Sequence, residues 1–374
     1  MADKIAALGP WVRLEGISTS QLPVGGRGVT PTNPVSSTEK YNDGSGSTAA
    51  PSLKQFVTNI LSESIPFIDG VAPKSGTKPT WKFKGTPRKY AASEAPVYVC
   101  ERVISGKELD KVEGMSKCSA DRKDETWICR RSCHRNTSEK GTASWEEFVR
   151  SFMEHHAETE EAFTPTVIGA REAIRWDTSG IEIEVDGGLW SNFIVLVEEM
   201  KHQIDPKPLK NRTFPVVQIA AELAGTQEFL VVSIPLNDFE KSPYAEYAKD
   251  KSLVVAAYTS VERIRVLPTS GEVEWIMATA SDAGGVLPRW IQNLAVPSAI
   301  AKDVQMFLSW IPSQRNADTK PAPISKSGPA GETLPAASAT SDAGMPPPIT
   351  KTEDKPTMAR ADPTNKDLPA APGQ

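Results

Sequence analysis

The chain has 374 residues, of which 39% are hydrophobic and 24% are charged, and its net charge at pH 7 is −5. That length suits two average domains or one large domain with appendages. The acidic balance argues against a general nucleic-acid binder, which normally carries a basic stripe, so we expect no nucleic-acid partner.

The N-terminal stretch has no continuous apolar core, and Asp3, Lys4 and Arg13 interrupt it early, so we expect no secretory signal. No apolar run approaches the roughly 20 residues that are needed to span a bilayer. We therefore expect a soluble, cytoplasmic protein that could contact a membrane peripherally without crossing it.

The four cysteines are Cys100, Cys118, Cys129 and Cys133, and His134 follows the last of them. Zinc sites of the finger and ribbon types depend on C-x2-C pairs, and none occurs here. The sequence therefore predicts reduced thiols, no metal site and no cofactor.

The first 70 residues are predicted to form N-terminal helices joined by a flexible linker. Apolar residues recur at helical spacing within residues 1–20 and again within 52–68, where Pro66 is expected to end the helix. Residues 21–51 are rich in Gly, Ser, Thr and Pro, which is typical of a flexible connection.

Residues 71–311 are predicted to form the main domain. Short strands are expected near Phe83 and Val99, followed by a loop or a mobile hairpin over 105–124 and a strand over 126–134. A helix then begins at Ser144, because Ser-Trp-Glu-Glu is a capping box in which serine and glutamate side chains satisfy orphan backbone N–H groups.

A series of strands follows, separated by Gly-, Pro- and Asp-containing turns, and no helix-length pattern interrupts its later members. The predicted strands are 167–176, 189–202, 213–223, 228–236, 253–267 and 272–280. Strands in series favour antiparallel pairing, and a closing helix after them gives an α+β fold.

The stretch from 272 to 311 changes from strand to helix periodicity, and it reads EVEWIMATASDAGGVLPRWIQNLAVPSAIAKDVQMFLSWI. Gly284 and Gly285 break the strand, and Pro288 suits a first helical turn. Apolar residues at helical spacing continue to Ile311 and predict a long amphipathic helix that lies on the sheet.

The residues after 311 are dominated by Pro, Ala, Ser, Thr, Lys and Asp, so 312–374 cannot bury enough apolar area to offset the entropy of ordering. We predict a disordered tail. It could recruit a protein partner, and the alternative is a tail that is simply solvated.

The wording EWIMATASDAGGVLPRWIQ, preceded by YTSVERIRVLP, resembles an uncharacterised START-like family found mainly in fungi. The resemblance covers roughly residues 127–311. It implies a helix-grip fold, in which a curved antiparallel sheet wraps a long C-terminal helix around a hydrophobic cavity. It also implies a lipid or another hydrophobic small molecule as partner.

The sequence contains neither a G-x-S-x-G nucleophile motif nor an H-E-x-x-H metal motif, so we assign no catalytic residue. Glu198 and Glu199 are neighbours in a strand and point to opposite faces, which excludes a carboxylate dyad. Parity also puts Arg263 and Arg265 on the face opposite Glu262, where we expect solvent.

Strand parity and the final helix nominate ligand-binding residues, because an apolar hollow with a few polar groups is the usual form of a small-molecule site. The candidates are Arg131, Trp190, His202, Glu262, Trp275, Met277, Trp290 and Leu294. An Arg–Glu pair inside such a cavity could meet a lipid headgroup. The alternative for each candidate is core packing or an ordinary surface charge.

Three functions stay open on the sequence alone. The favoured one is non-catalytic binding of a hydrophobic molecule, which could extend to its transfer. The second is an enzyme that uses Glu262 or His202 as a buried acid or base in the same pocket. The third is an interaction protein with a filled core and a partner-recruiting tail.

Overall fold

The computed structural model describes the chain in six segments, and within the last of these it describes the side chains of 295–315. The segments are 9–29, 51–72, 80–115, 122–205, 207–285 and 289–318. All of them belong to one compact unit, Met1–Pro321. The predictions for residues 1–8, for 30–50 within the linker and for 319–374 of the tail fall outside the described residues.

The centre of the molecule is a 12-stranded sheet in the order β1-β5-β7-β8-β9-β11-β12-β4-β3-β2, with β6 on β7 and β10 on β8. Neighbouring strands are antiparallel, as predicted, except that β10 runs parallel to β8. The strands are β1 (Arg27–Gly28), β2 (Lys82–Phe83), β3 (Tyr98–Ile104), β4 (Glu125–His134), β5 (Val167–Arg175), β6 (Ile183–Val185), β7 (Gly188–His202), β8 (Arg212–Leu223), β9 (Glu228–Pro235), β10 (Val254–Val255), β11 (Ala257–Val266) and β12 (Val273–Asp282).

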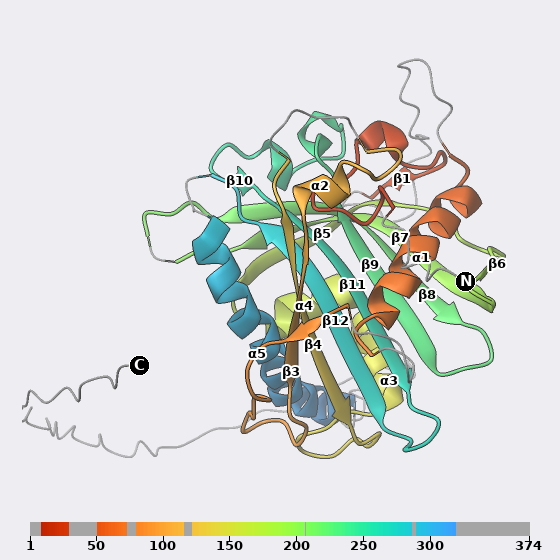
Figure 1. The fold of residues 1–374 in the computed structure, drawn as a ribbon, viewed down its shortest axis with the longest axis vertical. Helices are drawn as coiled ribbons and strands as arrows, with labels where there is room; N and C mark the ends of the chain where they lie inside the picture. Colours follow the sequence, from red (N-terminus) through yellow and green to blue (C-terminus); the bar gives the residue numbers. More distant parts are fainter. Residues whose placement is uncertain are drawn as a thin grey trace, which may run out of the picture. The chain divides into compact units, whose positions relative to one another are not determined.

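Helices lie on both faces of this sheet (Figure 1). They are α1 (Leu53–Asp69), α2 (Gly106–Leu109), α3 (Trp145–Phe148), α4 (His156–Phe163) and α5 (Arg289–Asp318), with a π-helical turn η2 (Val149–Glu154) and 3-10 turns η1 (Thr19–Gln21), η3 (Phe239–Lys241) and η4 (Tyr247–Lys249). The predicted capping box is confirmed, because Ser144 Oγ accepts from the Glu147 N–H and the Glu147 carboxylate accepts from the Ser144 N–H.

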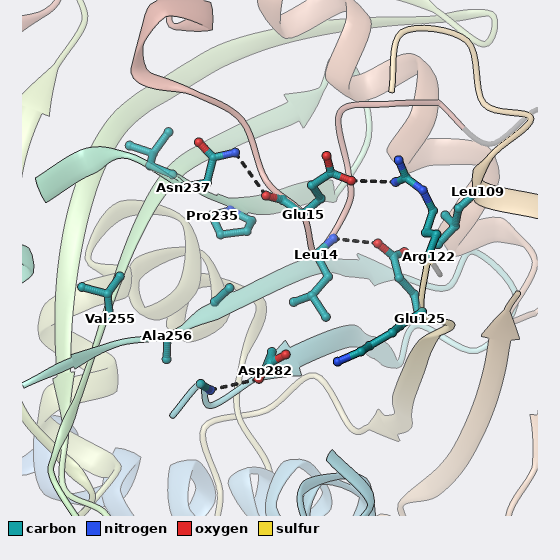
Figure 2. Close-up of a pocket in the computed structure, with 14 residues that line it drawn as sticks. Leu14, Glu15, Leu109, Arg122, Glu125, Pro235, Asn237, Val255, Ala256 and Asp282 are labelled. Atoms are coloured by element: carbon teal, nitrogen blue, oxygen red, sulfur yellow. Dashed lines mark hydrogen bonds and ion pairs between the residues drawn. The ribbon is translucent and has the colours of Figure 1, made fainter. Parts of the chain in front are cut away.

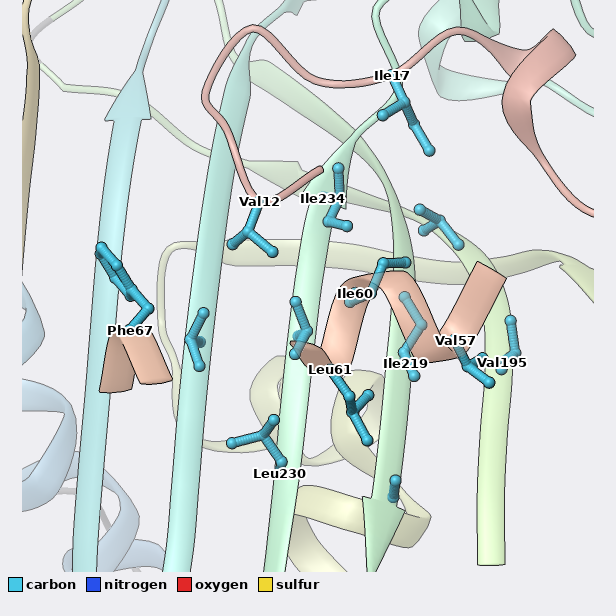
Figure 3. Packing of buried hydrophobic residues seen from close by; sticks show 14 of the residues in the cluster. Val12, Ile17, Val57, Ile60, Leu61, Phe67, Val195, Ile219, Leu230 and Ile234 are labelled. Atoms are coloured by element: carbon cyan, nitrogen blue, oxygen red, sulfur yellow. The ribbon is translucent and has the colours of Figure 1, made fainter. Parts of the chain in front are cut away.

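Each face of the sheet has its own apolar core. On the face that we call the α1 face, α1 lies across strands β7, β8 and β9, and Ile60 and Leu61 pack among strand residues such as Ile219 (Figure 3). On the opposite, α5 face, α3, η2, α4 and α5 pack on the other side chains of the same strands. A sheet covered on both faces explains why so many of its strands are apolar on both sides.

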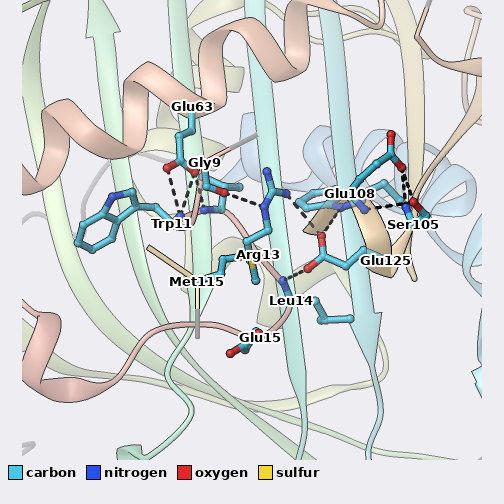
Figure 4. Close-up of polar contacts among 12 residues, drawn as sticks. Gly9, Trp11, Arg13, Leu14, Glu15, Glu63, Ser105, Glu108, Met115 and Glu125 are labelled. Carbon is cyan, nitrogen blue, oxygen red and sulfur yellow. Dashed lines mark hydrogen bonds and ion pairs between the residues drawn. The ribbon is translucent and has the colours of Figure 1, made fainter. Parts of the chain in front are cut away.

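The N-terminal segment is irregular where it is described, apart from the 3-10 turn η1 and the short strand β1, and it forms no α-helix there. Its backbone N–H groups at Trp11 and Val12 donate to the Glu63 carboxylate of α1, and the N–H of Leu14 donates to Glu125 of β4 (Figure 4). Burial raises the pKa of Glu63 to about 7. The predicted helix within 1–20 is therefore wrong from residue 9 onward, because bonds to other elements replace the helical ones.

Two predicted helix ends are also wrong. Pro66 lies inside α1, and Pro312 lies inside α5, which continues past Ile311 to Asp318. A proline removes one helical hydrogen bond, and packing can offset that loss. After Pro66, Phe67 continues the buried face of α1, with its ring 4.7 Å from the ring of Trp127. The predicted loop 105–124 likewise contains the short helix α2.

The C-terminal end of α5 is fixed to the N-terminal end of α3 by Arg315. Its guanidinium donates to both carboxylate oxygens of Glu147, at 2.6 and 2.9 Å, and to the carbonyl of Thr142 at 2.8 Å. Bidentate pairs of this kind are stronger than ordinary surface ion pairs.

We expect Arg315→Gln to lower the free energy of unfolding by about 1.5 kcal/mol, because the bidentate pair and the carbonyl bonds are lost together. Urea unfolding followed by tryptophan fluorescence measures the change. The matched control is Glu146→Gln on the exposed side of α3, which should stay within about 0.5 kcal/mol of wild type. Equal effects of the two substitutions would contradict the anchoring role.

Candidate functional site

Glu262 of β11 lies at the centre of a buried polar cluster on the α5 face. Its Oε1 accepts from Trp275 Nε1 at 2.6 Å and from Arg130 Nη2 at 3.2 Å. The Arg130 guanidinium also stacks on the Trp275 ring, 3.8 Å from its centroid. Sheet register explains the meeting, since Met277 of β12 pairs with Glu262 on one side and with Arg130 of β4 on the other.

The cluster continues from Glu262 to α4 and to two further strands. His156 Nε2 lies 3.9 Å from Glu262 Oε2, and Gln218 Nε2 lies 3.1 Å from His156 Nδ1 and 3.1 Å from Glu198 Oε1. An amide nitrogen can only donate, so His156 accepts at Nδ1 and its ring proton sits on Nε2, facing Glu262. We call Arg130, His156, Glu198, Gln218 and Glu262 the α5-face polar cluster.

Two more carboxyl groups lie beside this cluster. Glu160 of α4 and Asp303 of α5 are both half-buried. The pKa of Glu160 is raised to about 7, mainly by burial; His156 opposes the shift, and the negative charges of Asp303, Glu262 and Glu198 add to it. Burial also raises the pKa of Asp303 to about 7, against the opposing effect of Arg130.

Arg130 has more hydrogen-bonding capacity than its described neighbours use. Its side chain is 2% exposed, and Nε and Nη1 have no hydrogen-bond partner among the described residues. A buried donor without a partner costs about 1–3 kcal/mol, so such groups usually meet water or a ligand. These two N–H groups therefore mark a place where an acceptor from outside the chain would be stabilised.

Next to the polar cluster, aromatic rings fill the space between α5 and the sheet. Phe307 of α5 is fully buried and contacts every other member, with ring centroids 4.8 to 6.1 Å away. The members of this aromatic cluster are Phe148, Phe152, Phe163, Trp275, Phe307 and Trp310. The middle of α5 thus packs on solid core.

A small pocket of about 90 Å³ opens between α4 and strands β5 and β7. Three members of the polar cluster line it, namely His156, Glu198 and Gln218, together with apolar side chains such as Leu196. The polar cluster is therefore reached from this side of the sheet, although the pocket alone holds only a few water molecules.

Three candidates from the sequence lie together on the α5 face. Glu262 is 5% exposed, Trp275 is fully buried, and Met277 is half-buried between Glu262 and Arg130.

His202, a fourth candidate, ends β7, and the centroid of its ring lies 5.0 Å from that of the Phe214 ring. Burial lowers the pKa of His202 to about 4, so the imidazole is neutral at pH 7.

Two candidates lie on the α1 face instead. Trp190 packs in the α1-face core because a bulge between Ser191 and Ile194 shifts the parity of β7. Arg131 points away from Arg130 and pairs with Glu274 at 2.6 Å. The side chains of Trp290 and Leu294 lie outside the described residues.

The expected solvated face of β11 is also corrected. Arg263 is 3% exposed and pairs with Asp69 of α1, and Arg265 donates to Glu274 at 2.8 Å. This is the α1 face, which a helix covers. By contrast, the expected divergence of Glu198 and Glu199 is confirmed, since Glu199 accepts from the N–H groups of Glu246 and Ala248 rather than joining the cluster.

Sequence reasoning missed Arg130, His156, Gln218 and Asp303. Alternation along β4 separates Arg130 from Arg131, and the sequence analysis chose the wrong member of that pair. The signal that identifies Arg130 is the pairing of Glu262, Met277 and Arg130 across three strands, which requires the register.

A larger pocket of about 530 Å³ lies at one end of the sheet (Figure 2). Several of its charged groups bond to one another or to the backbone, as in the ion pair of Arg122 with Glu15 at 2.6 Å and the bond from the Leu14 N–H to Glu125 at 2.9 Å. Because these contacts already satisfy them, we favour the α5-face polar cluster as the candidate site.

Glu198 predicts a pH dependence of stability. Burial raises its pKa from 4.5 to about 8, and the charges of Glu158 and Glu172 add to the shift. Between those values the carboxyl is protonated when folded and ionised when unfolded, so the free energy of unfolding falls as the pH rises from about 5 to about 9.

We expect Glu198→Gln to reduce the fall in the free energy of unfolding with rising pH by on the order of 3 kcal/mol, because a glutamine side chain does not titrate. Urea unfolding at several pH values measures the change. Glu184→Gln, on the exposed side of β6, is the control and should leave the wild-type slope. An unchanged slope in Glu198→Gln would refute the assignment.

A large antiparallel sheet with helices packed on it, α5 among them, fits a helix-grip fold. A family model described as "Protein of unknown function (DUF3074)" matches residues 127–311, just under half of the chain. No curated protein matches the sequence.

Three solved structures are similar to the chain. Human STARD10 matches with a TM-score of 0.43 and 15% identity over 68% of this chain and 82% of its own. Human StAR-related lipid transfer protein 5 matches with a TM-score of 0.42 and 10% identity, over 72% of this chain and 99% of its own. The human StarD13 lipid transfer and protein localization domain matches with a TM-score of 0.35 and 12% identity, over 67% of this chain and 97% of its own. With all TM-scores below 0.5, we base the fold on the chain's own sheet and helices.

Within the described ranges, no helix combines the length and the apolar character that crossing a membrane requires.

Proposed function

We propose that the chain binds one hydrophobic small molecule, a lipid or a similar amphiphile, without catalysis, on the α5 face between the sheet and helices α4 and α5. In this proposal the sheet grips α5 as in a helix-grip fold. The ligand lies towards the N-terminal half of α5, because the aromatic cluster occupies the middle. Its polar end meets the α5-face polar cluster.

The observation that carries this proposal is Arg130. A guanidinium with two nitrogens, Nε and Nη1, that find no acceptor among the described residues is buried beside Trp275 and the apolar residues of the α5 core. A ligand oxygen at those groups would satisfy them, and apolar surroundings suit a hydrocarbon body. Of the sequence candidates, we keep Glu262, Trp275, Met277 and His202 as ligand-contacting residues.

Native mass spectrometry and solvent extraction of the purified full-length chain test this function. We expect one hydrophobic molecule per chain. Arg130→Met should lose the bound molecule, whereas Arg131→Met, one residue along on the opposite face, should keep it. A folded protein that neither carries nor accepts any hydrophobic molecule would overturn the proposal.

An enzyme on the same site is the second candidate, and one observation favours it. The Nε2 proton of His156 faces the Glu262 carboxylate, which makes a pair able to transfer a proton. If the extracted ligand is chemically converted on incubation with fresh protein, and His156→Gln abolishes the conversion while the ligand still binds, catalysis replaces simple binding.

A cytoplasmic location, peripheral membrane contact and partner recruitment by residues 312–374 remain part of the proposal. Comparing the full-length chain with one truncated after Asp318 tests them. Unchanged ligand binding with lost localisation would assign recruitment to the tail. Unchanged localisation would remove the tail from the proposal, and a filled core with intact recruitment would favour the interaction-protein alternative.

A further inference from the structure

Charge around the α5-face polar cluster is unbalanced. Carboxyl groups converge from four elements, namely Glu160 of α4, Glu198 of β7, Glu262 of β11 and Asp303 of α5. Among the described residues, the Arg130 guanidinium and, when protonated, His156 interact with these carboxyl groups. Arg171 and Arg175 line the same pocket as Glu198, but they pair with Glu199 and Glu172 instead. A ligand that brings positive charge would correct the imbalance.

Hydrogen bonding adds an independent requirement. Arg130 already donates one N–H to Glu262, and its Nε and Nη1 still lack acceptors among the described residues. An oxygen on the ligand would supply one. The polar end therefore has to combine a cation, or at least hydrogen-bond donors, with an acceptor a few ångströms away.

We infer that the polar end of the ligand is a protonated amine with a neighbouring hydroxyl group, as in a long-chain amino alcohol. The ammonium lies among the carboxylates, and the hydroxyl oxygen accepts from Arg130. This inference rests on the proposed function and narrows its ligand class. It disfavours fatty acids, because a carboxylate would join four protein carboxyl groups and would meet only one arginine, which is already paired with Glu262.

The pKa values of the carboxyl groups at the site agree with this chemistry. The pKa is raised to about 7 for Glu160 and Asp303 and to about 8 for Glu198. The groups that face these three are Arg130, His156 and Glu262, together with Glu158, Glu172 and the Tyr258 phenol. An ammonium would favour their ionised forms, so amine affinity should rise from about pH 6 to about pH 8.5.

Four probes with equal C18 chains test the inference on the full-length chain: sphinganine, octadecylamine, octadecanol and stearic acid. Displacement of a fluorescent apolar reporter and native mass spectrometry both report binding. We expect sphinganine to bind about tenfold or more tighter than octadecanol, and stearic acid to bind most weakly. If stearic acid bound as tightly as sphinganine or more tightly, this inference would be wrong, and the proposed function would stay intact. Binding of none of the four would overturn the proposed function.

Two variants that replace a carboxyl group with a neutral amide test whether the carboxylates hold the ammonium group of the ligand. Glu198→Gln and Asp303→Asn should each weaken octadecylamine about tenfold and leave octadecanol unchanged. The control is Glu146→Gln, an exposed carboxylate outside the cluster. Circular dichroism verifies that each variant is folded. If both variants bind the amine as wild type does, the amine is not held by these carboxylates and the inference is wrong.

Discussion

Phe307→Ala is expected to lower the free energy of unfolding by about 3–5 kcal/mol, since it removes a large ring from a fully packed site. Phe307 contacts every member of the aromatic cluster and joins α5 to α3, η2 and β12. The loss should therefore be near the upper end of the range for buried aromatic residues. Chemical denaturation followed by far-UV circular dichroism measures it.

Lys302→Ala, on the exposed side of α5, is the matched control and should change the free energy by less than about 0.5 kcal/mol. Should Phe307→Ala cost no more than the control, the contact between the middle of α5 and the sheet would be absent in solution. Such a result would also remove the surface on which the candidate site depends.

Arg130→Met is expected to cost about 3–5 kcal/mol, because it leaves the Glu262 carboxylate buried without its cation. The side chains of Arg130 and Glu262 are 2% and 7% exposed, so water compensates little. Adding Glu262→Gln should recover part of the loss, since a neutral amide needs no counter-charge.

The double-mutant cycle of these two substitutions measures their coupling. We expect a coupling free energy above about 1 kcal/mol, with the Trp275 Nε1 bond retained by the glutamine oxygen. Strictly additive effects would mean that the two charges do not interact. The cycle should be run on protein freed of ligand, because a bound molecule would stabilise wild type by mass action.

Much of the fold follows from local pattern. Alternation and turn residues predict the long strands, and the Ser144 capping box predicts the start of α3. Helix ends are harder, because Pro66 and Pro312 are tolerated where tertiary packing compensates for one lost hydrogen bond. No local pattern contains that information.

The candidate site could be predicted only in part. Parity within one strand found Glu262 and Trp275, which lie together. It failed for Trp190, where a bulge adds a residue, and for Arg131, because β4 has an arginine on each face at adjacent positions, Arg130 and Arg131. Choosing between two faces requires knowing that helices cover both, and that depends on contacts between residues more than a hundred positions apart.

The coverage of the α1 face bears on where the chain can be cut. The matched segment 127–311 omits α1, the N-terminal segment and β3, the strand that pairs with β4. A fragment with those limits would expose the apolar α1 face of the sheet and the unpaired edge of β4, and both promote self-association. The shortest polypeptide that folds on its own should therefore begin well upstream of the matched segment, and recombinant fragments that begin at residue 127 should precipitate.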